Sequence, residues 1–131
     1  MATILSIDDD SGLQELVGMV LGGHGHDVHW AFTGEEGYEK AQKLNPHLII
    51  LDMMLPTLNG VEVLKLLKAH ATLRRIPVIV ATALFGEAQY SETAIKALGA
   101  FEFLRKPVQY EALAALVGSA LMVVPPLKPG V

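Results

Sequence analysis

Short apolar runs alternate along the chain with longer segments in which apolar residues recur at helical spacing. The runs are rich in Ile, Leu and Val and predict strands near residues 3–8, 27–31, 47–52, 77–82 and 101–105. Strands that alternate with helices form a parallel sheet with helices on both faces. The pattern therefore predicts an α/β fold, a doubly wound sheet of five parallel strands made from five βα units.

Polar residues mark where the helices should begin. A Ser, Thr or Asn followed three residues later by Glu or Gln resembles a capping box. Three such pairs are Ser11 with Gln14, Thr33 with Glu36, and Asn59 with Glu62. They predict helices near 12–22, 34–44 and 60–70. Ser91 is the expected cap of a fourth helix that stops at Gly99, and a fifth helix is expected over about 109–122.

One domain accounts for most of the chain. The 131 residues are 51% hydrophobic, which is enough for one packed core and leaves no room for a second folded domain. We expect residues 1–122 to form this domain. Residues 123–131 include Pro125, Pro126 and Pro129 and predict an extended proline-containing tail or the stub of a linker.

The composition excludes several classes of function. The formal net charge is -4, whereas direct binding to nucleic acid or to an anionic membrane would require a basic face. Cysteine is absent, which excludes disulfides and thiolate chemistry. The N-terminus lacks the pattern of a secretory signal, and the longest uncharged run, 112–127, is too short to span a bilayer. We therefore expect a cytoplasmic protein.

Four of the predicted strands end in polar residues that suit phosphate chemistry. In an open parallel sheet the ligand site lies beyond the carboxyl ends of the strands. The strand-end residues are Asp8, Asp9 and Asp10 at the first strand, Asp52 at the third, Thr82 at the fourth and Lys106 at the fifth. Acids gathered at one edge need a cation or a proton to offset their charge. The sequence therefore predicts an acidic cleft with a hydroxyl and an amine beside it.

Each of these residues taken alone has an ordinary structural explanation. The acids at 8–10 could form a solvated turn that caps a helix, and Asp52 could be a turn residue. Thr82 could be a common strand residue, and Lys106 a surface lysine. Their joint occurrence at matching strand ends favours a functional site. The adjoining Pro107 supports this interpretation, because it can hold the backbone after Lys106 in a fixed turn.

Mg²⁺ suits the acidic cleft because it prefers a few carboxylates, a carbonyl and retained waters. Asp9 and Asp52 are the expected direct ligands, with Asp8 just outside them. A carboxylate can also attack phosphorus and form an aspartyl phosphate. Positive charge from the metal and from the Lys106 ammonium would then balance the phosphoryl oxygens, and the Thr82 hydroxyl could hydrogen-bond to one of them.

Four segments around these residues carry a close resemblance to a known family. They are Ile7-Asp8-Asp9-Asp10, Leu51-Asp52-Met53-Met54-Leu55-Pro56 with Gly60, Val78-Ile79-Val80-Ala81-Thr82-Ala83, and Phe103-Leu104-Arg105-Lys106-Pro107. Over about residues 2–122 the chain resembles a receiver domain of the two-component response regulators. The resemblance implies the flavodoxin-like (βα)5 fold with strand order 2-1-3-4-5, an order that such sheets share.

The resemblance also implies roles for individual residues. The implied phosphoacceptor is Asp52, the Mg²⁺ ligands are Asp8, Asp9, Asp52 and the Met54 backbone carbonyl, the phosphoryl contacts are Thr82 and Lys106, and the switch residues are Thr82 and Phe103. Phosphorylation should draw Thr82 toward the phosphoryl group and let Phe103 turn inward. The protein would then be a signalling switch and not an enzyme, since it would catalyse only its own phosphotransfer and dephosphorylation.

The implied partners are a sensor histidine kinase or phosphotransfer protein upstream and an unidentified protein downstream, with a phosphorylation-dependent homodimer as a further form of readout. The readout face is expected on the fourth helix, fifth strand and fifth helix. The fifth helix carries little charge, since Glu111 is the only charged residue from Gln109 to Leu127. The residues expected to face solvent or a partner are Ala112, Ala115, Gly118, Ser119 and Met122, and those expected in the core are Leu113, Leu116, Val117 and Leu121. A solvated alanine-rich surface is the alternative.

Two features depart from the family pattern. Leu55 stands where methionine is commoner, which is a tolerable apolar exchange. The stretch from Thr82 to Lys106 is longer than usual, which leaves open the conformation of the loop at Leu84, Phe85 and Gly86.

Three other functions fit the same architecture. A phosphohydrolase with an aspartyl-phosphate intermediate would need a general acid near Asp52, where Met53 and Met54 stand instead. A flavin or nucleotide carrier would need a phosphate loop rich in backbone donors, whereas the first βα loop here is acidic. A receiver-like scaffold that takes no phosphate is disfavoured by the complete set of acids, threonine and lysine.

Overall fold

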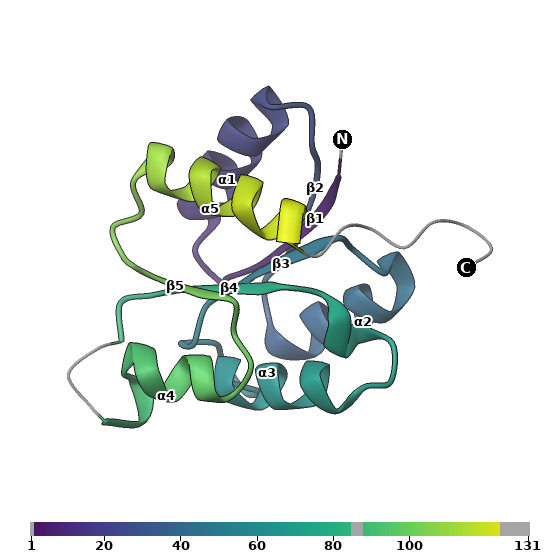
Figure 1. The fold of residues 1–131 in the computed structure, drawn as a ribbon, viewed down its shortest axis with the longest axis vertical. Helices are drawn as coiled ribbons and strands as arrows, with labels where there is room; N and C mark the ends of the chain where they lie inside the picture. Colours follow the sequence, from purple (N-terminus) through teal and green to yellow (C-terminus); the bar gives the residue numbers. More distant parts are fainter. Residues whose placement is uncertain (1, 85–87, 124–131) are drawn as a thin grey trace.

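A computed structural model of the chain describes residues 2–84 and 88–123, which form one parallel sheet between two layers of helices (Figure 1). In chain order the elements are β1 (Thr3–Ile7), α1 (Ser11–Gly23), β2 (Asp27–Ala31), α2 (Gly34–Leu44), β3 (Leu48–Leu51), α3 (Gly60–Ala69), η1 (Leu73–Arg75), β4 (Val78–Thr82), η2 (Ala88–Tyr90), α4 (Glu92–Ala97), β5 (Glu102–Arg105) and α5 (Tyr110–Val123). The strand order is β2-β1-β3-β4-β5 with every neighbouring pair parallel. The predicted fold class and strand order are confirmed.

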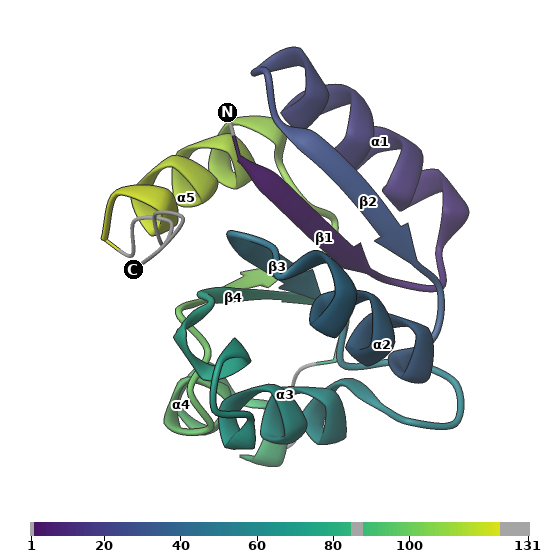
Figure 2. The ribbon, with the colours of Figure 1, turned by 90° about the vertical axis from the view of Figure 1, so that its right-hand side faces the viewer.

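The helices divide between the two faces of the sheet. α1 and α5 cover one face, and α2, α3 and α4 cover the other (Figure 1 and Figure 2). The winding direction reverses between β1 and β3, which are neighbours in the sheet. In open parallel sheets the crevice beyond the carboxyl ends at such a reversal is where ligands bind.

The inner strands are apolar throughout because helices cover both of their faces. Alternate residues point to opposite sides, so Ile4 and Leu48 pack in the cluster beneath α1 and α5, while Leu5 and Ile49 pack in the cluster facing α2, α3 and α4. All four side chains are fully buried. Burial of a side chain of this size stabilises a fold by about 1.5–3 kcal/mol. The packing on both faces therefore holds the carboxyl ends of the inner strands in fixed positions.

Three of the predicted helix caps are confirmed, and one prediction was wrong. Thr33, Asn59 and Ser91 each accept a hydrogen bond from a backbone N–H in the first turn of the following helix. α1 is capped by Asp10 in place of Ser11, because the Asp10 carboxylate already accepts the N–H groups of Gly12 and Leu13. No capping box joins Ser11 to Gln14, whose side chain is instead fully buried.

Other parts of the chain gave no sequence signal or lie outside the described residues. The short helices η1 and η2 were not predicted, because three residues are too few to show an apolar period. α5 continues through Val123, one residue into the expected tail. The rest of that tail, and Phe85 and Gly86 of the unusual loop, are not described. Among the helices within 2–84 and 88–123, none combines the length and the apolar character needed to cross a membrane.

Gly60 brings α3 against the backbone that follows β3. A Cβ atom there would lie 2.1 Å from the carbonyl oxygen of Asp52 and 2.5 Å from the Cα of Met53. We expect Gly60→Ala to lower the free energy of unfolding by about 1–3 kcal/mol, because neither backbone atom can move without disturbing the strand. Urea denaturation followed by circular dichroism measures this change.

Gly118 supplies the control, since it lies inside α5 and a Cβ there would meet no atom within 4 Å beyond its chain neighbours and the nearby helix backbone. Gly118→Ala should raise the free energy of unfolding by about 0.5–1 kcal/mol, because alanine favours a helix over glycine. Equal effects of the two substitutions would show that helix propensity, and not the close approach at Gly60, decides stability.

Candidate functional site

Three carboxylates converge where β1 and β3 end. The register pairs Ile7 with Leu51, so the residues that follow them, Asp8 and Asp52, emerge side by side. Asp9 completes the group, and one carboxylate oxygen from each acid lies within 4.8 Å of the others. Asp8 and Asp52 are buried, whereas Asp9 is exposed. The predicted group of acids therefore gathers at the predicted edge of the sheet.

Backbone hydrogen bonds fix the two buried acids. The Asp8 N–H donates to the carbonyl of Ala31 at 3.0 Å, and the Asp52 N–H donates to the carbonyl of Ile7 at 3.0 Å. Their carboxylates accept N–H groups from two residues further along the chain, Asp10 to Asp8 Oδ1 at 2.9 Å and Met54 to Asp52 Oδ1 at 3.1 Å. Each acid thus keeps its second oxygen, Oδ2, for another partner.

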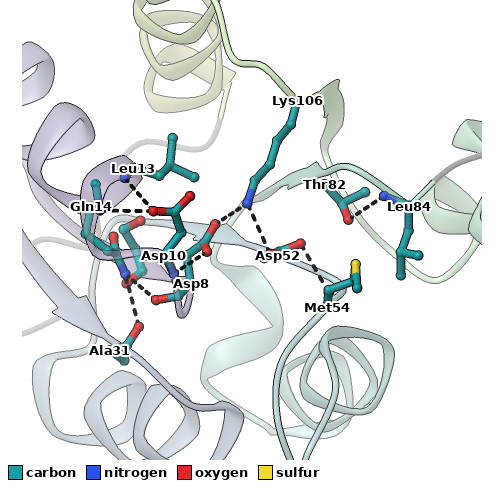
Figure 3. Close-up of polar contacts among 12 residues, drawn as sticks. Asp8, Asp10, Leu13, Gln14, Ala31, Asp52, Met54, Thr82, Leu84 and Lys106 are labelled. Atoms are coloured by element: carbon teal, nitrogen blue, oxygen red, sulfur yellow. Dashed lines mark hydrogen bonds and ion pairs between the residues drawn. The ribbon is translucent and has the colours of Figure 1, made fainter.

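That partner is the ammonium of Lys106, which bridges the two acids (Figure 3). Its Nζ lies 2.8 Å from Asp8 Oδ2 and 3.1 Å from Asp52 Oδ2. Lys106 follows the last residue of β5, its N–H donates to the carbonyl of Thr82, and its peptide bond to Pro107 is cis. The ammonium of Lys106 therefore links the end of β5 to the ends of β1 and β3.

Burial and neighbouring charges shift the pKa values of Asp8 and Lys106. Burial raises the pKa of the Asp8 carboxyl above its ordinary value, and the hydrogen bonds from Lys106 and the Asp10 N–H offset this only in part. The negative charge of Asp52 raises the Asp8 pKa further. Burial by itself lowers the pKa of Lys106, but its hydrogen bond to Asp8 and the charges of both acids outweigh burial, so the net shift is upward. Lys106 therefore stays an ammonium at neutral pH.

Thr82 and Phe103 occupy different surroundings from the acids. Thr82 is the last residue of β4 and is fully buried, and its Oγ1 accepts the N–H of Leu84 at 3.1 Å. Phe103 lies within β5, beside Val80 of β4, and its side chain is already buried in the cluster that faces α2, α3 and α4. An inward turn on phosphorylation would require Phe103 to be exposed beforehand, whereas in this structure its side chain is already buried.

Met54, two residues after Asp52, is 54% exposed.

One residue of the site was not found by sequence reasoning. Gln14 lies on the buried face of α1 and its amide contacts the backbone below the acidic turn (Figure 3). The signal that could have found it is its spacing, since Gln14 shares a helical face with Val17 and Leu21. A polar residue on an apolar face must find partners inside the protein.

The residues present fit a divalent cation. The cluster offers three carboxylates and one ammonium, which leaves an excess of negative charge. All of the donor atoms are oxygens, and a few carboxylates with room for water is the set that Mg²⁺ prefers. The arrangement can therefore hold a hard cation and, beside it, an incoming anionic group.

Comparison with known proteins agrees with this geometry. The family described as "Response regulator receiver domain" matches residues 4–118. The chain is 38% identical over 121 residues to the DNA-binding dual master transcriptional regulator RpaA of Synechocystis sp., covering 92% of this chain and 49% of that protein. It is 32% identical over 122 residues to the DNA-binding response regulator MtrA of Mycobacterium tuberculosis, covering 90% and 50%. The chain thus spans about half the length of these curated relatives.

Solved structures show the same fold along nearly the whole chain. The signal receiver domain of a signal transduction histidine kinase from Syntrophus aciditrophicus superposes with a TM-score of 0.89 at 27% identity, covering 100% of this chain and 98% of that one. A putative response regulator from Chloroflexus aurantiacus gives a TM-score of 0.85 at 30% identity, covering 92% and 98%.

The raised pKa of Asp8 predicts that Asp8→Asn stabilises the chain at neutral pH in the presence of a chelator. Asp8 ionises more readily in the unfolded chain than in the folded one, so at neutral pH its charge opposes folding. This cost is complete above the folded-state pKa and vanishes as the pH falls below the unfolded value of 3.8. Urea unfolding in EDTA should show a higher free energy of unfolding for the variant at neutral pH and a shrinking difference toward acid.

Asp9→Asn is the control, because the Asp9 side chain is exposed and its charge is already solvated. Its effect on stability should be smaller than that of Asp8→Asn. An Asp8→Asn chain that is less stable than the parent at neutral pH would contradict the electrostatic account.

Proposed function

Because the chain belongs to the family of response regulator receiver domains, we propose that it is a phosphorylation-dependent signalling switch that accepts a phosphoryl group on Asp52. The donor is a sensor histidine kinase or a phosphotransfer protein. The observation that carries the proposal is the bridge of the Lys106 ammonium between Asp8 and Asp52. The bridge brings together Asp52, which can act as a nucleophile, Asp8, which can bind a cation, and the Lys106 ammonium, which can neutralise phosphoryl oxygens.

Asp52 acts as the nucleophile. One of its carboxylate oxygens bonds to the phosphorus of a phosphohistidine, the P–N bond breaks, and the imidazole nitrogen keeps the electron pair. The product is an acyl phosphate on Asp52. Neither Met53 nor Met54, the two residues that follow Asp52, carries an ionisable group, so neither can serve as the general acid that a phosphohydrolase would need.

The carboxylates of Asp8, Asp9 and Asp52, together with the backbone carbonyl of Met54, would hold Mg²⁺. When bound, the ion supplies positive charge next to the phosphoryl oxygens, where negative charge gathers during transfer. The support for this assignment is the convergence of the three carboxylates within 4.8 Å and their excess negative charge.

Lys106 and Thr82 hydrogen-bond to the phosphoryl group once it is on Asp52. Lys106 donates to a phosphoryl oxygen once the charge of Asp52 has passed to the acyl phosphate. Thr82 lies at the neighbouring strand end, where its hydroxyl has one hydrogen to donate besides accepting the Leu84 N–H. A shift of Thr82 toward the phosphoryl group changes the packing next to Phe103, and the buried position of Phe103 is one of the two arrangements between which the switch moves.

The proposed role of Asp52 predicts that Asp52→Asn abolishes phosphoryl labelling. The parent chain should be labelled by acetyl phosphate or a histidine kinase only with Mg²⁺ present, because the metal must offset the charge of both the acids and the incoming phosphate. Labelling is followed by intact-protein mass spectrometry or by phosphate-affinity electrophoresis.

The control for this labelling is Asp27→Asn, which removes an exposed aspartate at the start of β2 and should leave labelling unchanged. If Asp52→Asn is labelled as strongly as the parent, Asp52 is not the phosphoacceptor.

Another prediction concerns the lifetime of the acyl phosphate. Met54 and Leu84 each lie two residues beyond a site residue, Asp52 and Thr82 respectively, and the backbone of each contacts that residue. Neither side chain has a hydrogen-bond donor or a strong acceptor with which to orient an attacking water. The phosphorylated chain should therefore be long-lived, and Met54→Asn with Leu84→Glu should shorten its lifetime.

The loss of labelled Asp52 over time, measured after removal of the phosphodonor, compares the double variant with the parent. Met54→Leu with Leu84→Met, which keeps both side chains apolar, is the matched control and should keep the parental rate. If the double polar variant loses phosphate no faster than this control, positions 54 and 84 do not set the lifetime of the acyl phosphate.

The readout surface is the face formed by α4, β5 and α5. On α5, Ala115, Gly118, Ser119 and Met122 are exposed, while Leu113 and Val117 are buried, as the sequence predicts. Ala112, expected at the surface, and Leu116 and Leu121, expected in the core, are half-buried, and Ala120 is an additional core residue. Small uncharged residues allow a helix of a partner, or of a second copy of the chain, to approach closely, and at about 25 cal/mol per Å² a modest patch suffices for a switchable contact.

We expect Ala115→Arg with Ser119→Arg to abolish the assembly that Mg²⁺ and beryllofluoride, a phosphoryl mimic, induce in the parent chain. Two cationic side chains on the contacting face would have to be desolvated on association. Light scattering of parent and variant measures the effect. Gln42→Arg, on the exposed side of α2, is the control for added charge. Parental assembly of the double variant would place the contact on another face.

A further inference from the structure

The side chain of Gln14 lies buried beneath the acidic turn. Its Nε2 lies 3.0 Å from each of three backbone carbonyl oxygens, those of Ser6, Asp8 and Ala31. Ser6 lies in β1, Asp8 is the first residue after β1, and Ala31 is the last residue of β2. The amide of Gln14, on α1, thus connects the carboxyl ends of β1 and β2 next to Asp8, the first acid of the site (Figure 3).

The chemistry of these contacts fixes the direction of the Gln14 amide. Carbonyl oxygens only accept hydrogen bonds, so the nitrogen must face them, and the side-chain oxygen then points away. That oxygen is buried and has no hydrogen-bond partner among the described residues. The two N–H groups of the Gln14 amide are shared among these three carbonyl oxygens, and the hydrogen bonds hold the side chain in one orientation although its own oxygen has no partner among the described residues.

The contacts of Gln14 reach the acidic cluster through the backbone of Asp8. Gln14 binds the Asp8 carbonyl, while the Asp8 N–H donates to the Ala31 carbonyl, which Gln14 also binds. Both polar groups of the Asp8 backbone are therefore anchored within one small network. The direction in which the Asp8 carboxylate projects, toward Lys106 and Asp52, follows from this anchored backbone.

We propose that Gln14 is a positioning residue for the acidic cluster, whose amide holds the Asp8 backbone so that the three carboxylates converge on a divalent cation. Gln14 does not touch the reacting atoms. The inference rests on the proposed function, since the cation is the Mg²⁺ of the phosphoryl-transfer site. Partners that orient a ligand from behind usually change metal affinity when they are replaced.

The test compares Gln14→Met with Val17→Ala in the full chain. Methionine has nearly the shape of glutamine but no N–H, whereas Val17 is a buried packing residue of the same helix. Both variants should have a lower Tm than the parent. Calorimetric titration should show Mg²⁺ binding weakened by roughly tenfold in Gln14→Met, and a parental Mg²⁺ Kd in Val17→Ala.

The outcomes separate this inference from the proposed function. A parent chain that binds no Mg²⁺ overturns both. A parent that binds Mg²⁺ while Gln14→Met binds it with the same Kd overturns only the role of Gln14. An equal loss of affinity in Val17→Ala would also overturn it, because the loss would then follow from lower stability alone.

The unsubstituted chain provides a second measurement if Gln14→Met does not fold. In NMR spectra, the side-chain amide protons of Gln14 should exchange with solvent far more slowly than those of the exposed Gln42, and should shift when Mg²⁺ is added. Exchange as fast as that of Gln42, or an unchanged Gln14 signal when Mg²⁺ binds, contradicts the proposal.

Discussion

The parallel pairing of β1 with β3 is the constraint on which the site depends. Its register sets Ile7 beside Leu51, so both strands end at the same level and deliver Asp8 and Asp52 next to each other. Two buried carboxylates repel each other and lose hydration, so this edge of the sheet requires positive charge. In the structure the Lys106 ammonium supplies it, in contact with both acids.

The surrounding architecture keeps this charged group in place. Helices on both faces bury the inner strands, and the close approach of Gly60 holds α3 against the backbone of Asp52. Gln14 holds the backbone of Asp8 from the opposite face. A site whose charges are fixed before the ligand arrives spends little free energy on reorganisation during transfer. The raised pKa of Asp8 shows that this preorganisation costs stability.

The sequence predicted the sheet and the positions of the site residues, but not the contacts behind them. The strands were readable because burial on both faces leaves continuous apolar runs, and strand ends in a parallel sheet must share one edge. Gln14 was misread as part of a capping box, since its spacing from Ser11 does not show which helical face turns inward. The buried position of Phe103 could not be predicted either, because it depends on packing between β5 and the helices facing it.

The Mg²⁺ affinity of Lys106→Met tests most directly the claim that the ammonium and the metal satisfy the same two acids. Methionine keeps an unbranched side chain that is one atom shorter and removes its charge, so Asp8 and Asp52 would lose the cation that competes with the metal. Calorimetric titration should show tighter Mg²⁺ binding in Lys106→Met than in the parent, and near-parental binding in Lys106→Arg. Weaker or unchanged Mg²⁺ binding in Lys106→Met would contradict the account.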